Sequence, residues 1–402
     1  MTAATKAPPL AFTVPVDSMF GPAIKVGSIV PARGEKPIIS NIRFSVNNGV
    51  LELEGTDLKA FLRHTIPAAT ITTPGSGLLA GSRLLEVLKE FRGAEATFVF
   101  DPRGGCRLTT TGNTYRLVGD DPRDFPTLAR FDADPGFQIK GSVLVDMVNK
   151  TEFAAADEQT RYAIGGVNFE LKGSRFRLAA TDTKRIAVSQ QTLQIPLKPD
   201  GQPEIADFSV VAPLSFFRLL KRVISKDLME SMVTVGVSGP YLFVRLPNAI
   251  VHTLLVAGRF PAYEEGFKAV LSKHIDCTVE TFATLLKRAI LVEAGKAVFE
   301  FSPNLLTLRS EMPTVGASSV SMPTPYTGET TKIGFSPLFI KEALEVMTSE
   351  RCRLAFDGPK KIATLKEIVV SADVAKGELV SDCFAYAIMP VVIPGEDRSA
   401  ND

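Results

Sequence analysis

The segment Thr151–Val188 has the sequence TEFAAADEQTRYAIGGVNFELKGSRFRLAATDTKRIAV and holds the clearest local order in the chain. Residues 167–171 and 176–180 alternate apolar and polar side chains with period two, which is typical of half-buried strands. The residues before them, 143–153, have the spacing of a helix. The segment therefore predicts a helix followed by antiparallel sheet.

The polar turn TDTKR, residues 181–185, leads from the second of these strands into a third, 186–188. By itself this turn predicts only that Asp182 accepts hydrogen bonds from its own backbone in a hairpin. The same turn occurs earlier, because residues 51–59 read LELEGTDLK and Asp57 lies 125 residues before Asp182. That distance is the length of a small domain. The two turns therefore indicate an internal repeat.

A third and more diverged copy of the strand and polar turn lies at 305–311, without the Thr-Asp pair. Amphipathic helices recur at matching positions, each after a strand-like stretch, and are predicted at 82–91, 213–224 and 336–347. A second set of helices is predicted at 19–30, 143–153 and 281–291. The fold class is therefore α+β, with three copies of one unit of two helices and roughly eight short strands. The predicted domains are 1–135, 136–270 and 271–402.

The first third of the chain gives the strand pattern of one copy. A loose tail is predicted at 1–11, because these residues are small, polar and rich in proline. The strands predicted after it are 12–14, 38–44, 50–54, 96–100, 106–109 and 115–118.

Composition restricts the class of protein. The 402 residues carry a net charge of +1, so any binding of nucleic acid must come from how charge is distributed over the surface. The four cysteines lack CxxC spacing, which argues against a zinc site or a disulfide framework. No signal peptide and no membrane-length apolar run is evident. A cytoplasmic protein without metal or cofactor is expected.

Basic side chains gather on some of the predicted helices. Arg218, Lys221 and Arg222 share one helix of the second copy, and Lys287 and Arg288 lie on a helix of the third. A helix buries one stripe against a sheet, so the other stripe faces elsewhere. A solvated surface of mixed charge and a nucleic-acid-facing surface both fit this pattern.

Four segments together resemble the bacterial sliding clamp family, the beta subunit of DNA polymerase III. They are DEQTRYAIGGVNFE (157–170), LAATDTKRIAV (178–188), GRFPAYEE (258–265) and AYAIMPV (385–391), in the family's order. The resemblance implies a head-to-tail homodimer whose helices line a hole and whose antiparallel sheets form the outside. Such a ring encircles double-stranded DNA without reading its sequence, since phosphates attract Lys and Arg at any position. The implied function is that of a DNA polymerase processivity factor.

The resemblance also implies a cleft that accepts short peptides from the polymerase III alpha subunit, the clamp loader and repair proteins. Its residues map onto Ile164, Thr181, Thr183, Lys184, Arg185, Ile186, Pro261, Glu265, Gly266, Ala387, Ile388, Met389, Pro390 and Val391. Departures from the family pattern, which affect peptide preference, are Lys184, Glu265, Gly266, Val392 and the tail Pro394–Asp402.

Two further sets of residues follow from the same resemblance. DNA contacts map onto Arg33, Arg161 and Tyr162, with Glu158 an acid at a position where an amide is usual; the basic helix residues Arg218, Lys221 and Arg222 join them. The dimer edge maps onto Tyr115 and Leu117, facing Ile290 and Leu291 of the partner copy. Plain core packing is the alternative for these last four residues.

Two rival classes remain. An enzyme would need a catalytic motif, and the chain contains no GxxxxGK[ST], HExxH, GxGxxG or GxSxG. Asp157 and Glu158 are adjacent on a turn, where side chains diverge, so they make a poor acid and base pair. The other rival is a three-repeat binding scaffold that does not encircle DNA. It would lack the closed dimer and the basic inner face.

Overall fold

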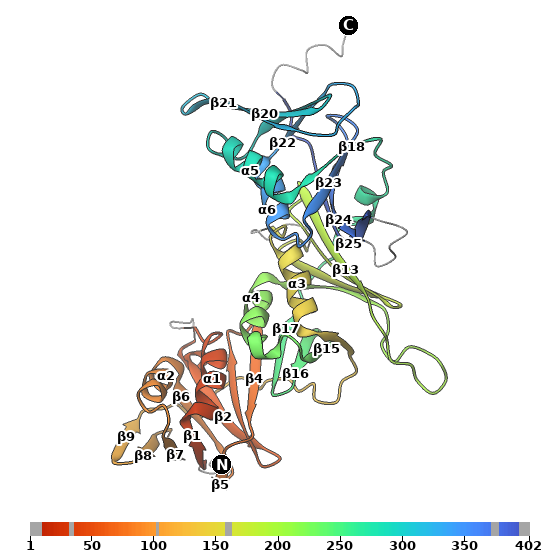
Figure 1. Ribbon diagram of the computed structural model, residues 1–402. Helices are drawn as coiled ribbons and strands as arrows, with labels where there is room; N and C mark the ends of the chain where they lie inside the picture. Colours follow the sequence, from red (N-terminus) through yellow and green to blue (C-terminus); the bar gives the residue numbers. More distant parts are fainter. Residues whose placement is uncertain (1–9, 32–35, 102–103, 157–162, 371–377, 394–402) are drawn as a thin grey trace. The chain divides into compact units, whose positions relative to one another are not determined.

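The computed structural model describes residues 10–31, 36–101, 104–156, 163–370 and 378–393 (Figure 1). The chain divides into two compact units. Unit 1 contains Met1–Leu144, Gln194–Ile205 and Ser215–Leu255, and unit 2 contains Val145–Leu193, Ala206–Leu214 and Val256–Asp402. Each unit therefore combines one terminal repeat with part of the central one.

The elements follow one order three times. The first repeat contains β1 (Ala11–Pro15), α1 (Val16–Gly27), η1 (Pro37–Ser40), β2 (Asn41–Asn47), β3 (Val50–Thr56), β4 (Ala60–Ile66), β5 (Thr70–Thr73), β6 (Ser76–Ala80), α2 (Gly81–Glu90), β7 (Glu95–Phe100), β8 (Cys106–Thr110) and β9 (Asn113–Leu117). The central repeat contains β10 (Phe137–Lys140), α3 (Gly141–Glu152), β11 (Gly166–Lys172), β12 (Arg175–Thr181), β13 (Arg185–Thr192), β14 (Phe208–Pro213), α4 (Leu214–Val223), η2 (Lys226–Leu228), β15 (Met232–Ser238), β16 (Tyr241–Leu246) and β17 (Ala249–Leu254). After η3 (Glu264–Phe267), the third repeat contains β18 (Lys273–Thr278), α5 (Val279–Ile290), β19 (Ala297–Ser302), β20 (Leu305–Met312), β21 (Gly316–Pro323), β22 (Thr331–Phe335), α6 (Pro337–Glu345), β23 (Arg351–Phe356), β24 (Ala363–Val370) and β25 (Glu378–Ile388).

The predicted α+β repeat is confirmed, with corrections to its first elements. The helix predicted at 19–30 is three residues earlier: it begins at Val16, directly after Pro15, and ends at Gly27, where the next residue, Ser28, donates its hydroxyl to Lys25 O at 2.7 Å. The strand predicted at 38–44 was wrong in its first part. Pro37 opens a 3-10 turn there, and the strand begins only at Asn41.

Unit 1 contains two antiparallel sheets. The five-stranded sheet has the order β5-β1-β7-β8-β9, and the eight-stranded sheet has the order β10-β15-β16-β17-β4-β3-β2-β6. The eight-stranded sheet joins the central and first repeats where β17 pairs with β4. His252 lies directly opposite Phe61 in this pairing. We call this place the first junction.

Unit 2 has the same plan. Its eight-stranded sheet has the order β14-β11-β12-β13-β25-β24-β23-β18, and its four-stranded sheet has the order β21-β20-β19-β22. The central and third repeats join where β13 pairs with β25, and Ala387 lies directly opposite Ile186. We call this place the second junction.

The helices cover sheets with one apolar face. In α4, Phe216, Phe217 and Leu220 are buried, while Arg218 and Arg222 are exposed. Helix α5 packs on α6 and on β21, and α1 packs on α2. Burial of this stripe fixes each helix on its sheet and leaves the polar stripe outside the core.

Candidate functional site

The Thr-Asp turn has the same geometry in both of its copies. Asp57 Oδ1 accepts hydrogen bonds from the amides of Lys59 and Ala60 at 2.9 and 2.7 Å. Asp182 Oδ1 accepts from the amides of Lys184 and Arg185 at 3.0 and 3.1 Å. The hydroxyl of the preceding threonine, Thr56 or Thr181, donates to the carbonyl that begins the next strand. In both turns the aspartate thus accepts hydrogen bonds from its own backbone, as the sequence predicts.

Each turn holds one side-chain-bearing residue in the left-handed region, Leu58 at φ 73° and Thr183 at φ 76°. A residue other than glycine is strained in this conformation, so the hydrogen bonds of the turn must hold it there. Thr183 and Lys184 are both exposed beyond the sheet. The two residues are therefore available to a partner.

Arg185 is buried at the second junction. Its Nε donates to Asp182 Oδ2 at 3.0 Å, its Nη2 donates to Phe153 O at 2.8 Å, and its Nη1 pairs with Glu342. The guanidinium also stacks over the ring of Phe339, 4.1 Å from the centroid. Burial acts to lower the pKa of Arg185, but Glu342 and its other acidic neighbours outweigh burial and raise it. Arg185 therefore joins β13 to the turn after α3 and to α6, and its guanidinium is held by these contacts.

The C-terminal strand forms one wall of the predicted cleft. Ala387 and Ile388 are buried in β25, whereas Met389 is 47% exposed. The Met389 amide donates to Lys184 O at 2.8 Å, and the Val391 amide donates to Gly334 O at 2.8 Å. The predicted segment from residue 387 to residue 391 thus runs from the sheet interior to an exposed end beside the Thr-Asp turn.

The chain segment after Pro261 lies across the same sheet face. Tyr263 packs on Ala179 and Val188, and Ile186, Phe260 and Phe267 pack around them. A Cβ at Gly266 would lie 3.3 Å from Ile362 Cδ1 and 3.7 Å from Ile186 Cδ1, so this glycine lets η3 approach the sheet closely. Pro261 is half-buried and Glu265 is exposed. Ile164 is buried, and its carbonyl accepts from the Ala156 amide at 3.0 Å.

A cavity of about 430 Å³ opens further along this face. Residues from strands β12, β13, β24 and β25 line it, together with residues of η3 and its flanks: Arg175, Arg177, Val188, Gln190, Tyr263, Glu264, Phe267, Lys268, Lys366, Asp382 and Ala385. Burial raises the pKa of Tyr263 to about 12, so its hydroxyl stays protonated at neutral pH. Sequence reasoning missed this cavity, although the segment GRFPAYEE contains both Tyr263 and Glu264.

The first junction is filled at the corresponding place. The ring of Phe61 stacks on His252 with centroids 4.7 Å apart, and Phe131 approaches His252 edge-on at 4.9 Å. Phe125 and Leu128 are buried against Phe61. Burial lowers the pKa of His252 to about 3, and the cation of Arg63 adds to the effect. The imidazole is therefore neutral and acts as a core side chain.

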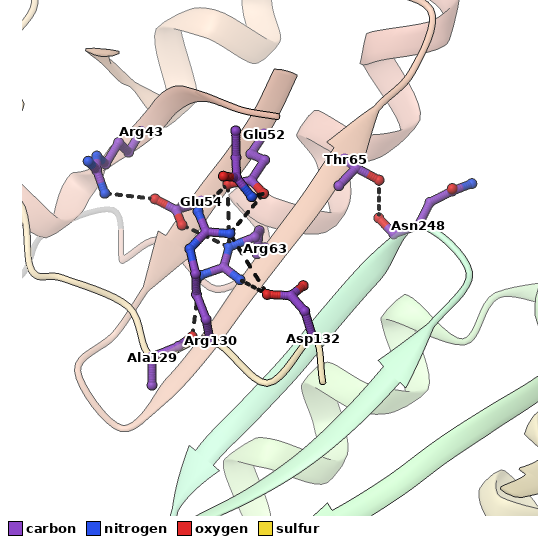
Figure 2. A network of polar contacts seen from close by, with 10 residues as sticks. Arg43, Glu52, Glu54, Arg63, Thr65, Ala129, Arg130, Asp132 and Asn248 are labelled. Atoms are coloured by element: carbon purple, nitrogen blue, oxygen red, sulfur yellow. Dashed lines mark hydrogen bonds and ion pairs between the residues drawn. The ribbon is translucent and has the colours of Figure 1, made fainter. Parts of the chain in front are cut away.

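A buried ion-pair network lies beside these rings (Figure 2). Arg63 Nε lies 3.0 Å from Glu54 Oε1 and 3.6 Å from Glu52 Oε2, and all three side chains are almost fully buried. Arg130, from the segment that links the first and central repeats, donates from Nη2 to Glu52 Oε2 at 2.8 Å. Arg43 pairs with Glu54 at 3.0 Å. The network ties this segment to strands β2, β3 and β4.

The predicted DNA-facing residues are only partly described. Arg218 is exposed on α4, and Arg222 Nη1 donates to Ser28 O at 3.3 Å. Lys221 lies between them and is half-buried. The predictions for Arg33, Arg161 and Tyr162 fall outside the described residues, as do Asp157 and Glu158.

The predicted dimer residues lie at sheet ends. Tyr115 and Leu117 are on β9, the last strand of the five-stranded sheet, and Tyr115 is 39% exposed. Ile290 ends α5, and Leu291 after it is 80% exposed. Strand β21, on which α5 packs, is the last strand of the four-stranded sheet. Tyr115 and Leu291 are thus exposed apolar side chains on different units, whereas Leu117 is buried.

Three family models match successive parts of the chain. They describe the N-terminal, central and C-terminal domains of the DNA polymerase III beta subunit and match residues 10–129, 138–262 and 270–376. The chain belongs to this family. Its members include the beta sliding clamp of Escherichia coli K12, 25% identical over 389 residues, which cover 94% of this chain and 99% of that protein. The beta sliding clamp of Chlamydia trachomatis serovar D is 27% identical over 333 residues, which cover 82% of this chain and 77% of that protein.

Solved structures show the same fold. The DNA polymerase III subunit beta from Pseudomonas aeruginosa superposes with a TM-score of 0.85 at 22% identity, covering 95% of this chain and all of that one. The sliding clamp from Bacillus subtilis gives a TM-score of 0.85 at 21% identity over 96% of this chain and 99% of that one. As a beta sliding clamp family member, the chain has the three-domain α+β clamp fold. It is a non-catalytic processivity factor whose partners are DNA and the polymerase.

Two histidines make contacts within the fold. His64 Nδ1 donates to Thr65 O at 2.9 Å, and His252 is buried among rings. Within the described residues, no three His, Cys, Asp or Glu side chains come close enough to hold a metal ion. No described helix is long and apolar enough to cross a membrane.

Proposed function

We propose that two copies of this chain close into a ring around duplex DNA by joining β9 of one copy to β21 of the other. Both strands end their sheets, and their outward residues are largely exposed. An unpaired strand edge offers amides and carbonyls to any matching strand, and a two-fold ring removes both edges. These open edges are the observation that carries the proposal. The proposal also includes the domain boundaries at residues 135 and 270, which separate the three repeats.

Apolar contacts would stabilise this closure. Tyr115 stands on β9 beside Phe91, with ring centroids 5.5 Å apart, and Leu117 packs beneath the same sheet. In the partner copy, Ile290 and Leu291 end the helix that packs on β21. Joining the edges brings these two apolar sets face to face. Burial of a side chain as exposed as Leu291 contributes roughly 1.5 to 3 kcal/mol.

The DNA inside the ring would meet basic helix surfaces. Arg218, Lys221 and Arg222 lie on α4, and Lys287 and Arg288 are exposed on α5. Their charges would contact phosphates without base readout, which allows sliding. Arg33, Arg161 and Tyr162 complete the proposed DNA-contacting set.

The second junction would bind the partner peptides. Thr183, Lys184 and Met389 are exposed beside the apolar residues Ile186 and Ala387. An apolar anchor of a peptide fits against such a surface, and the exposed end at Met389 and Pro390 can pair with its backbone. The proposed partners are the polymerase III alpha subunit, the clamp loader and repair proteins, in the cytoplasm. The alternative of a scaffold that does not encircle DNA is not favoured, because the family relatives are sliding clamps.

The ring is tested by the double substitution Ile290→Ala and Leu291→Ala. Sedimentation at low micromolar concentration should give dimers for the wild type and monomers for the variant. Val270→Ala, which removes a 92% exposed apolar side chain elsewhere, is the matched control and should stay dimeric. A dimeric double variant would show that the interface lies at other residues.

Encirclement is tested separately on DNA. Clamp loaded onto circular duplex should stay bound when salt is raised, whereas clamp on linear duplex should slide off its ends. Equal loss from both DNAs would mean that charge alone holds the protein.

A further inference from the structure

The cavity beside the second junction is positively charged. Its lining contains four cationic side chains, Arg175, Arg177, Lys268 and Lys366, against the carboxylates of Glu264 and Asp382. Both carboxylates already have partners, since Arg177 Nη1 lies 2.6 Å from Glu264 Oε1 and Lys366 Nζ lies 2.6 Å from Asp382 Oδ1. Two cations of the lining are therefore left over.

These remaining cations are Arg175 and Lys268. Both side chains are exposed, and neither forms an ion pair with a side chain that the structure describes. They come from different elements, the start of β12 and the end of η3. A ligand with a negative charge would be attracted to both at once.

Tyr263 is a further residue of the lining. Tyr263 lines it with a side chain that is only 6% exposed, and its hydroxyl has no hydrogen-bond partner of good geometry among the described groups, although Arg177 lies close by. The hydroxyl is covered by its neighbours, so the groups that a ligand in the cavity can reach are the two free cations, Arg175 and Lys268. A carboxylate matches this pair in charge.

The cavity continues the proposed peptide site along one strand. Ile186, Val188 and Gln190 alternate on the same face of β13, and Gln190 lies opposite Arg177 of β12. Four residues of strand span roughly 13 Å. This face of the sheet is therefore apolar at Ile186 and cationic near Gln190 and Arg177. About four residues of an extended peptide can span that distance.

We propose that this cavity is a second subsite for partner peptides, which receives an acidic side chain about four residues from the apolar anchor. The inference rests on the proposed peptide site at the second junction. It names the chemistry that this clamp selects in its partners: an apolar anchor with an acidic flank. Exposed Glu265, next to the apolar end, opposes acids close to the anchor, so the distance between anchor and acid matters.

The test uses a fluorescent peptide from the alpha subunit of the same organism's polymerase III, titrated into the full-length dimer. One version of the peptide carries two Asp residues about four positions before the apolar anchor, and a second version carries them about four positions after it. Matched peptides carry Asn at the same positions. At one of the two ends, Asp should tighten binding about fivefold over Asn, the size expected of exposed ion pairs. Arg175→Gln with Lys268→Gln should remove this difference and leave the Asn peptide unaffected.

A control variant with the same change in charge, Lys332→Gln with Lys360→Gln, should keep the preference for Asp, because these exposed lysines lie outside the cavity. Equal affinity of the Asp and Asn peptides at both ends would overturn the second subsite while leaving the apolar site standing. Equal preference for Asp in both charge variants would also overturn it, since the effect would then be one of net charge. Failure of the Asn peptide to bind at all would refute the peptide site and this inference with it.

Discussion

The two junctions are built alike and differ in what fills them. In each, a strand of the Thr-Asp hairpin pairs with the last strand of the next repeat, and a segment that begins with Phe-Pro crosses the sheet. Phe61 of the first junction corresponds to Ile186 of the second, 125 residues later. His252, opposite Phe61, corresponds to Ala387, opposite Ile186. Two rings at one junction are replaced by an isoleucine and an alanine at the other.

This difference supports the proposed peptide site at the second junction. At the first junction the rings of Phe61, His252 and Phe131 pack against one another, and Phe125 and Leu128 of the linking segment are buried against Phe61. At the second, Gly266 and Ala387 carry little volume beside Ile186. On the same backbone plan, the size of a few side chains thus distinguishes the first junction from the second.

The ion pair between the sheet and the linking segment has opposite polarity at the two junctions. Glu52 of β3 pairs with Arg130 of the first linking segment, whereas the corresponding strand residue, Arg177 of β12, pairs with Glu264 of the second. The first network surrounds the buried Arg63. The second leaves cations at the surface of a cavity. At the first junction the charged side chains thus pair with one another and hold the linking segment in place. At the second junction, cations remain available to a ligand.

The largest difference should appear when the central cation of the first junction is removed. Arg63→Ala would leave Glu52 and Glu54 buried with fewer partners and should lower the free energy of unfolding by about 3 to 5 kcal/mol. Arg130→Ala, at a side chain that is 42% exposed, should cost less than about 1 kcal/mol. Urea unfolding measures both. Similar losses for the two variants would show that burial does not decide the strength of this network.

Acid should destabilise the first junction through His252. Its pKa is about 3 in the folded protein and near 6.5 when unfolded, so the unfolded state binds the extra proton between these values. Stability should therefore fall with pH below 6.5, by up to about 1.4 kcal/mol per pH unit, relative to a His252→Phe variant. Unfolding at pH 7 and pH 5 in parallel gives this difference. Identical pH dependence of the two proteins would contradict the low pKa.

Filling the second junction should turn it into a copy of the first. Ile186→Phe places a ring against Ala387 and Gly266 and should weaken binding of a polymerase-derived peptide about tenfold, or 1.4 kcal/mol. The dimer should persist. The reverse change at the first junction, Phe61→Ile, is the matched control and should leave peptide affinity unchanged. Normal peptide binding by Ile186→Phe would place the anchor elsewhere.

The smallest difference concerns the shared turn. Asp57→Ala and Asp182→Ala each remove an acceptor of two amides, which costs about 1 kcal/mol. Asp182 also holds the buried Arg185, so its loss should cost roughly 1 kcal/mol more than the loss of Asp57. Thermal unfolding compares the two variants. Equal costs would mean that Glu342 and the ring of Phe339 hold Arg185 without help.

The sequence predicted what local patterns determine. Hydrophobic spacing gave the helices of all three repeats, and the spacing of Asp57 and Asp182 gave the repeat itself. It could not show that β13 pairs with β25, because alternation identifies the buried face of a strand and not the neighbour along its edge. Helix α1 lies three residues earlier than predicted, because the apolar pattern used to place it continues through Ile29 and Val30, beyond the end of the helix at Gly27.

The resemblance predicted which residues belong to the candidate site, but it predicted what their side chains do less well. Arg185 maps to the cleft, yet its guanidinium is held inside by Asp182, Glu342 and Phe153 O, contacts between distant segments that no local pattern contains. Tyr263 and Arg177 were missed for the same reason. Their importance depends on a cavity that exists only after the sheet has formed.

The pairing of β13 with β25 also sets the order in which a newly made chain becomes useful. Ile186 meets Ala387, which the ribosome adds 201 residues later. At roughly 5 to 20 residues per second, β13 waits about 10 to 40 seconds with an open edge, which is exposed to aggregation for that time. A copy whose translation stops before β25 lacks the strand that forms one wall of the proposed peptide site. Under the proposed function, only a chain translated through β25 can recruit the polymerase.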